Sequence, residues 1–278
     1  MSLADDIATT PGDAPGVYRL ELSDAWDFRK PSGGVLTSCA LAAARAEIGD
    51  DSLSLLSATA TFLEPLDAGP LEATVEILRR GRSAAQVRAH LFAEGSRGLE
   101  VTATFARERS ASGFELLIAR PPEAVPVAEA LDIAGDKDPA NWHVRTRFFQ
   151  NFDARLAIGT PFWRDSSGAG IHREVGRWFR YHEPPERDGS LDPLGLPPIA
   201  DTIPAALWQF RGPGEPFYAP SLDLTVHFLE PAPLGWLLNK SYVRWAGRGY
   251  ATGEAEIWTE SGRLVAYATQ TMLIARRK

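Results

Sequence analysis

The sequence is short of sulfur, of basic charge and of long apolar runs, and each shortage excludes a class of protein. The single cysteine among 278 residues, Cys39, rules out an intramolecular disulfide and cysteine-rich zinc or iron–sulfur sites. Twenty-nine basic against 36 acidic residues give a formal charge of −7, without the basic excess of a nucleic-acid-binding face. No stretch approaches the roughly 20 apolar residues of a membrane-spanning helix. We therefore expect neither a nucleic acid nor a membrane as partner.

A secretory signal is also missing. The first residues, MSLADDIATTPGDAPG, are acidic and polar and lack an apolar segment, so we expect a cytoplasmic protein. With 44% apolar and 23% charged residues, the composition is that of a globular chain and not of a disordered, collagen-like or coiled-coil one. At roughly 150 residues per domain, the length predicts about two domains.

What the sequence does contain is an internal repeat. The tetrapeptide Phe62–Pro65 (FLEP) recurs as Phe228–Pro231, at an offset of 166. Without gaps, this offset makes 13 of the 46 positions from residue 59 to residue 104 identical. A match of this density indicates two copies of one module. We place the N-terminal module at residues 1–108, a Pro- and Ala-rich linker at 109–141 and the C-terminal module at 142–278.

Both copies show the same order of predicted elements: an extended segment, a helix, then four antiparallel strands. Alternating apolar and polar residues between glycine-containing turns predict half-buried strands. These strands are expected at 53–63, 71–80, 84–93 and 99–108, and again at 220–229, 236–245, 250–259 and 263–275. Helices are expected at 33–48, with Gly49 as its C-terminal stop, and at 201–210. Extended segments precede them at 16–22, 144–158 and 173–183.

A lone five-stranded sheet around one helix leaves an open edge, and pairing two copies edge to edge removes it. The predicted fold class is therefore α+β, with one continuous antiparallel sheet around two central helices.

The order of the motifs resembles a known family. Gly33-Gly34 opens a helix, FLEP lies on the next strand, Gly-Arg stands at a hairpin, and GRLVAYATQ lies near the C-terminus. In this order and spacing the chain is similar to the double-hotdog acyl-CoA thioesterases, the acyl-CoA thioesterase II group, over nearly its whole length. The resemblance implies two tandem hotdog modules and hydrolysis of an acyl-CoA to free acid and CoA. It implies no cofactor, because CoA is part of the substrate, and it suggests a homodimer by analogy.

The resemblance also implies site residues. In that family an Asp, a Thr or Ser, and a Gln orient the water that hydrolyses the thioester. By position these are Asp201, then Ser221 two residues before another Asp, and Gln270 on the last strand. Gly33 and Gly34 would let a thioester carbonyl approach backbone N–H groups at a helix N-terminus, which stabilise an oxyanion.

The repeat allows these assignments to be compared between the copies. The offset of 166 places Val35 opposite Asp201 and Leu55 opposite Ser221. Thr104 stands opposite Gln270, or Phe105 if one residue is gapped. Only the second copy would then keep a polar site, as expected if the other was lost because unused buried polar groups cost stability.

Other interpretations of the same residues stay open. Asp201 stands where a helix is expected to begin and is a favoured N-cap residue, while Ser221 and Gln270 also fit ordinary strand positions. His227 is expected to be a strand residue, and the other histidines lack metal-ligand spacing, so we expect no metal site. The alternatives to a thioesterase are a non-catalytic acyl-CoA-binding hotdog protein and a hotdog dehydratase or hydratase.

Coenzyme A carries phosphate groups, which arginine binds well. Arg79, Arg80 and Arg82 cluster at one predicted hairpin, and Arg244 and Arg248 at the matching one. We take Arg79, Arg82 and Arg248 as candidate CoA ligands; solvated turns are the alternative.

Overall fold

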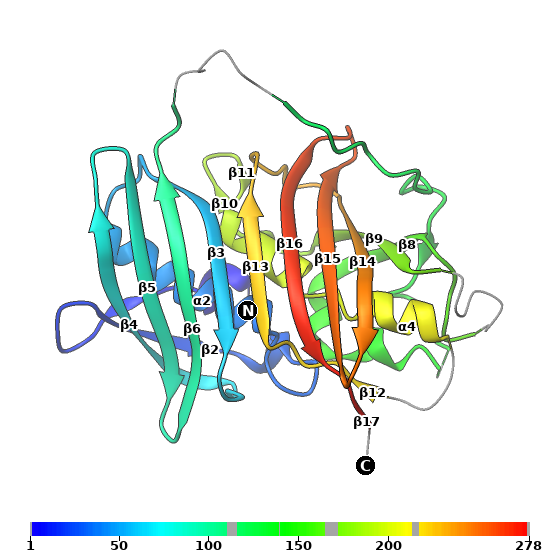
Figure 1. The fold of residues 1–278 in the computed structure, drawn as a ribbon, viewed down its shortest axis with the longest axis horizontal. Coiled ribbons are helices and arrows are strands. Elements are labelled where there is room, and N and C mark those ends of the chain that lie inside the picture. Colours follow the sequence, from blue (N-terminus) through cyan, green and yellow to red (C-terminus); the bar gives the residue numbers. More distant parts are fainter. Residues whose placement is uncertain (1, 110–115, 139, 165–171, 213–216, 277–278) are drawn as a thin grey trace.

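A single large sheet runs through both copies (Figure 1). The structure is a computed structural model that describes residues 2–109, 116–138, 140–164, 172–212 and 217–276. Within these residues 13 strands form the sheet in the order β1-β2-β4-β5-β6-β3-β13-β16-β15-β14-β9-β8-β7, and every neighbouring pair is antiparallel. The continuous sheet predicted from the repeat is therefore confirmed.

The strands divide between the copies as the repeat requires. The first copy contributes β1 (Thr10–Pro11), β2 (Val17–Leu22), β3 (Ser54–Phe62), β4 (Gly69–Arg80), β5 (Ala84–Ala93) and β6 (Ser96–Ala106). The remaining strands of the sheet are β7 (Leu131–Asp132), β8 (Phe152–Ile158), β9 (Glu174–Tyr181), β13 (Asp223–Phe228), β14 (Leu237–Gly247), β15 (Tyr250–Thr259) and β16 (Leu264–Leu273). Two short pairs lie outside it, β10 (Glu186–Arg187) with β11 (Ser190–Leu191) and β12 (Phe217–Tyr218) with β17 (Ala275–Arg276).

The two copies meet where β3 pairs with β13. In this register Thr59 lies directly opposite Thr225, the residue that the repeat equates with it. Their hydroxyl oxygens are 3.0 Å apart and share a hydrogen bond. Because equivalent residues face each other only on a symmetry axis, this pair marks the pseudo-two-fold axis that relates the modules.

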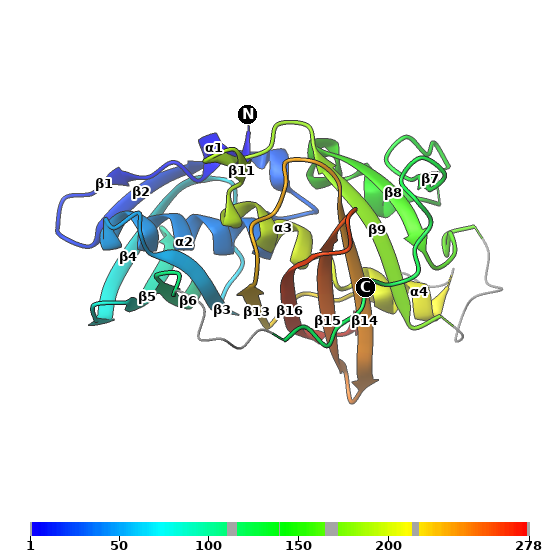
Figure 2. The same ribbon diagram turned by 90° about the horizontal axis from the view of Figure 1, so that it is seen from above.

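The sheet curls around two central helices, which pack against its inner face and against each other (Figure 2). The first is α2 (Gly33–Ile48), and it ends as predicted because Gly49 adopts the left-handed conformation at φ 57°. The other helices are α1 (Leu3–Asp6), α3 (Leu196–Ala200) and α4 (Ala205–Arg211). Short 3₁₀ helices complete the described elements, namely η1 (Asp24–Trp26), η2 (Trp142–Arg145), η3 (Arg147–Asn151) and η4 (Pro193–Gly195).

The second central helix differs from its prediction. A single helix was expected at 201–210, but the helical segment begins at Pro193 and consists of η4, α3 and, after a break, α4. Prolines cause both differences. Pro197 and Pro198 occupy the first turn of α3, where the missing N–H costs nothing, whereas Pro204 interrupts the chain of hydrogen bonds before α4. Asp201 consequently follows one helix instead of starting one.

Two further segments depart from the sequence analysis. Extended structure was expected over 144–158, but η2 and η3 occupy its first part because the Phe148 ring packs with Trp26 and Phe28 of the first copy. The predicted linker packs on the outer face of the second module, where Val125 and Val127 receive hydrogen bonds from Trp178 and Arg155, and it adds β7 to the sheet. Its residues 110–115 and 139 lie outside the described residues.

Candidate active site

Asp201 lies at the junction of the two central helices. It is the C-cap residue of α3, and its carboxylate reaches across to the N-terminus of α2. The Gly34 N–H donates to Asp201 Oδ2 at 2.9 Å, and the Ser32 hydroxyl donates to the same oxygen at 3.0 Å. The hypothesis that Asp201 caps its own helix is therefore wrong. It caps the helix of the other copy, where the positive end of the helix dipole favours an anion.

Ser221 and Gln270 converge on the same carboxylate. Ser221 forms an isolated bridge with Met272 just before β13, and Gln270 lies on the inner face of β16. The Gln270 amide nitrogen donates to Asp201 Oδ1 at 2.6 Å and to Ser221 Oγ at 2.6 Å. Ser221 Oγ lies 3.2 Å from Asp201 Oδ1 and donates to it. The structure thus brings together the three residues that the sequence analysis singled out.

Ser32 is a member of the site that the sequence analysis missed. It precedes α2 and is 1% exposed, and its hydroxyl bonds Asp201 instead of capping its own helix. A serine directly before a helix is the ordinary signal of an N-cap. That signal marked the helix start but could not reveal a bond to a residue of the other copy.

The two glycines of α2 have different tasks. A Cβ on Gly34 would lie 2.3 Å from the carbonyl oxygen of Pro197, so glycine is required for the helices to approach. The Gly34 N–H is already engaged by Asp201. Gly33 is partly exposed, and its N–H has no hydrogen-bond acceptor among the described residues. The Val35 N–H also has no acceptor among the described residues, but Val35 is fully buried, so Gly33 supplies the accessible backbone donor at this helix end.

Burial sets the electrostatics of the site. Asp201 is 7% exposed, and desolvation raises the pKa of its carboxyl group, because the charged form is disfavoured away from water. Hydrogen bonds from Gly34, Ser32, Gln270 and Ser221 act in the opposite direction, and the pKa remains raised. The Oε1 atom of Gln270 is buried without a hydrogen-bond partner among the described residues. A basic carboxylate and a free acceptor thus lie side by side.

The candidate CoA ligands do not all lie near this site. Gln270 pairs with Gly253 close to the turn between β14 and β15, and Arg248 stands in that turn. Arg79 lies near the end of β4 and Arg82 in the turn between β4 and β5, which belong to the first copy, far from β14 and β15 in the sheet (Figure 1). Arg248 therefore adjoins the strand that pairs with Gln270, whereas Arg79 and Arg82 lie in the first copy.

The histidine of the dehydratase hypothesis is not part of the site. His227 is exposed on β13, stacks on the Tyr267 ring at 6.2 Å, and lies on the face opposite to the buried Val226 and Phe228. Within the described residues no group of three or more His, Cys, Asp and Glu side chains is arranged to hold a metal ion.

The structure corrects two counterpart positions. Thr225 pairs with Thr269 and Thr59 with Thr102, so one extra residue in the second copy puts Ala103, not Thr104 or Phe105, opposite Gln270. Counted from the start of α2 at Gly33 and of η4 at Pro193, Leu41 corresponds to Asp201, whereas the ungapped offset gave Val35. Leu41 and Ala103 are buried and apolar, as is Leu55 opposite Ser221. The polar site is thus confined to one half.

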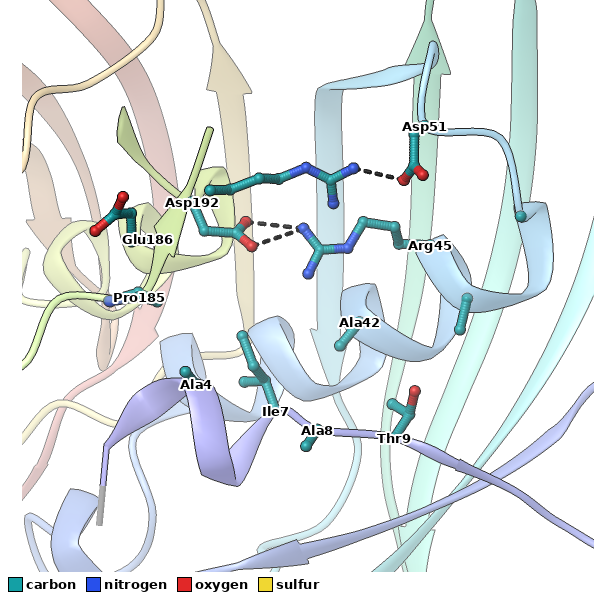
Figure 3. A pocket seen from close by; sticks show the side chains of 13 residues that line it. Ala4, Ile7, Ala8, Thr9, Ala42, Arg45, Asp51, Pro185, Glu186 and Asp192 are labelled. Atoms are coloured by element: carbon teal, nitrogen blue, oxygen red, sulfur yellow. Dashed lines mark hydrogen bonds and ion pairs between the residues drawn. The ribbon is translucent and has the colours of Figure 1, made fainter. Parts of the chain in front are cut away.

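An ion pair occupies the helix start that the pseudo-two-fold axis relates to the start of α2. Asp192 precedes η4 as Ser32 precedes α2, and its carboxylate accepts from the Leu194 N–H at 2.9 Å. Arg45 of α2 approaches this carboxylate at 2.8 Å beside an open pocket of about 440 Å³ (Figure 3). A carboxylate of the same copy therefore caps the second helix, and Arg45 of the first copy neutralises that carboxylate.

Fold and site together define a class: a double hotdog in which a buried carboxylate, a hydroxyl and an amide meet at the end of one central helix. Solved structures of this fold resemble the chain over its full length. A hot dog protein of unknown function from Alicyclobacillus acidocaldarius is 21% identical, with 99% of this chain and 98% of that one covered and a TM-score of 0.79. The acyl-CoA thioesterase II TesB2 of Mycobacterium marinum is 21% identical, with 100% and 99% covered and a TM-score of 0.77. The tesB protein of Mycobacterium avium subspecies paratuberculosis is 16% identical, with 98% and 97% covered and a TM-score of 0.74.

Comparison with models of protein families identifies the family of the chain and not only its fold. The N-terminal domain of acyl-CoA thioesterase matches residues 22–106, and its C-terminal domain matches residues 122–274. The chain therefore belongs to the acyl-CoA thioesterase family and is a thioester hydrolase. A comparison with curated proteins gave no match. In the described part of the chain, none of the helices has the length and apolarity that crossing a membrane requires.

Proposed function

We propose that the protein hydrolyses acyl-CoA thioesters with a water molecule that Asp201, Ser221 and Gln270 orient. The single observation that carries this proposal is the convergence of the Gln270 and Ser221 side chains on the buried Asp201 carboxylate, at 2.6 and 3.2 Å from its Oδ1. A buried carboxylate with a raised pKa is a stronger base than an exposed one, and it stands beside an acceptor that can hold a water hydrogen.

The proposed reaction needs no cofactor and no covalent intermediate. Asp201 removes a proton from water while the water oxygen attacks the thioester carbon, and the Gln270 Oε1 accepts the other water hydrogen. The Gly33 N–H donates to the carbonyl oxygen as it gains charge. The tetrahedral intermediate then collapses, the carbon–sulfur bond breaks, and the proton on Asp201 passes to the departing CoA thiolate. The products are a free acid and CoA.

The test is thiol release from short, medium, long and aromatic acyl-CoAs. The Asp201→Asn variant keeps the shape of the side chain and loses the base, so release should fall by about 10²–10⁴-fold, the usual contribution of a general base. Asp192→Asn is the matched control, because Asp192 is also a buried carboxylate bonded to a helix N-terminus. We expect its activity to stay within about twofold of wild type, as for changes away from the reacting groups. Undiminished release by Asp201→Asn would refute the mechanism.

A further inference from the structure

Arg177 and Asn239 are buried polar residues of the second copy, and the first copy has no such pair at the equivalent position. Arg177 on β9 and Asn239 on β14 lie directly opposite each other and are 3% and 1% exposed. At the equivalent place in the first copy, β2 and β4 pair Tyr18 with Ala73. Burying polar groups costs free energy unless something is gained. The Arg177–Asn239 pair therefore calls for a function, and it occurs only in the copy that carries Asp201.

Both side chains bind the backbone on either side of Asp201. The Asn239 amide donates to the Ile199 carbonyl at 2.7 Å and to the Thr202 hydroxyl at 2.7 Å. Arg177 donates to the Thr202 carbonyl at 3.0 Å. The Thr202 hydroxyl in turn donates to the Ile199 carbonyl at 2.8 Å, which closes the network.

The position of these bonds follows from the break in the helix. Pro204 has no N–H, so the helix cannot continue from α3 into α4. At the break the backbone makes only three-residue turns, in which the Ile199 carbonyl accepts from the Thr202 N–H at 3.3 Å and the Thr202 carbonyl from the Ala205 N–H at 3.2 Å. Such three-residue bonds have poorer geometry than the bonds of an α-helix. Side chains from two strands of the sheet add a second donor to each of these carbonyl oxygens and tie the break to the sheet.

Burying the Arg177 guanidinium costs more free energy than burying a neutral hydrogen-bond donor would. No carboxylate lies within ion-pair distance of it among the described residues, and its guanidinium faces the Phe149 and Phe179 rings at 5.6 and 5.3 Å. Burial lowers the pKa of Arg177 to about 9. An apolar side chain in place of an uncompensated buried charge is often neutral or stabilising. Stability alone therefore does not explain this arginine.

We propose that Arg177 and Asn239 are positioning residues that hold the helix break so that the Asp201 carboxylate stays within reach of the Gly34 N–H, Ser221 and Gln270. The inference rests on the proposed function, in which Asp201 is the base. The two residues do not touch the carboxylate themselves. They act through the Ile199 and Thr202 carbonyls, three residues apart in the chain around Asp201.

Steady-state kinetics of Arg177→Met and Asn239→Leu provide the first test. We expect kcat to fall about tenfold or more with little change in KM, because small displacements of a catalytic group are costly. Arg177→Met should keep or raise the melting temperature, which a merely structural role would not allow. Gln209→Leu is the control: Gln209 is fully buried on α4 and bonds Thr160 instead of the Asp201 segment. It should lower the melting temperature and leave kcat unchanged.

A second measurement determines the pKa of Asp201 and does not depend on enzyme turnover. NMR follows the carbon-13 signal of the Asp201 carboxyl group as a function of pH in wild type and in each variant. The signal is assigned as the carboxyl signal that is missing from the spectrum of Asp201→Asn. The four groups that bond this carboxylate are neutral donors that lower its pKa, so losing their geometry while the group stays buried should raise the pKa. An unchanged pKa in Arg177→Met and Asn239→Leu, or an equal change in Gln209→Leu, would overturn the inference. If the wild type releases no thiol but the pKa effect is present, the proposed function fails and the positioning role stands.

Discussion

The close approach of α2 to α3 depends on the absence of a side chain at Gly34. A Cβ there would lie 2.3 Å from the Pro197 oxygen, 2.6 Å from its carbonyl carbon and 2.7 Å from Pro198 Cα. These are backbone atoms of a proline-stiffened turn, so no side chain can rotate away. Overpacking costs about 1–3 kcal/mol, and the upper end applies here. Replacing a helical glycine by alanine returns about 0.5–1 kcal/mol. The net expected loss for Gly34→Ala is about 2 kcal/mol, which is roughly 4–8 °C in Tm at this size.

The assay is urea denaturation together with calorimetric melting, and two glycine variants calibrate it. Gly235→Ala meets no heavy atom within 4 Å and should change stability by about 0.5 kcal/mol at most. The nearest neighbours of a Cβ in Gly33→Ala would be the end of the Phe62 ring, at 2.7 Å, and the Asp201 carboxylate, at 3.3 Å. Because that ring can move, its loss should be smaller than that of Gly34→Ala. Equal stabilities of Gly34→Ala and Gly235→Ala would show that helix contact does not require this glycine.

Two further predictions concern buried carboxylates. Burial raises the pKa of Asp201 above its unfolded value, so the folded chain binds that proton more tightly and loses stability as pH rises through this interval. The free energy of unfolding of Asp201→Asn should therefore rise relative to that of wild type as the pH increases from about 4 to neutrality. Urea denaturation at these two pH values checks this, and the same difference between variant and wild type at both would contradict it. Arg45→Met leaves the Asp192 carboxylate, 8% exposed, without its cation and should cost about 2 kcal/mol, less than a fully buried pair because Arg45 is 29% exposed. Adding Asp192→Asn should recover part of that loss, and strictly additive losses in the double variant would argue against the coupling.

The sequence patterns correctly predicted the elements whose ends are determined by neighbouring residues in the chain. The ends of α2, β5 and β15 were placed correctly, because Gly49 and the hairpin glycines stop these elements by their own conformation. The start of the second helix was misplaced, because an aspartate was taken as its N-cap and the prolines before it were not weighed as first-turn residues. The continuity of the sheet through both copies followed from the repeat, because pairing two copies removes an open sheet edge.

The site was predictable only where residue type and order carry the information. Asp201, Ser221 and Gln270 were found through their likeness to a family, whereas Ser32 binds across the two copies and left only the signal of a helix cap. Arg177 was missed for a different reason. The predicted linker covers the outer face of β9, where Trp178 packs, so this strand is buried on both faces and its sequence does not alternate. Without alternation, the inward-facing position of Arg177 could not be identified.

The two helix starts show why duplication left one site and not two. Each helix N-terminus attracts a carboxylate, because its free N–H groups carry partial positive charge. At η4 that carboxylate is Asp192, which Arg45 neutralises. At α2 it is Asp201, which has only neutral donors and keeps a raised pKa. A cation beside Asp201 would stabilise its charged form and weaken it as a base. The same structural feature can therefore serve stability or proton transfer, but one carboxylate cannot serve both well, and in the proposed mechanism the two helix starts divide these tasks.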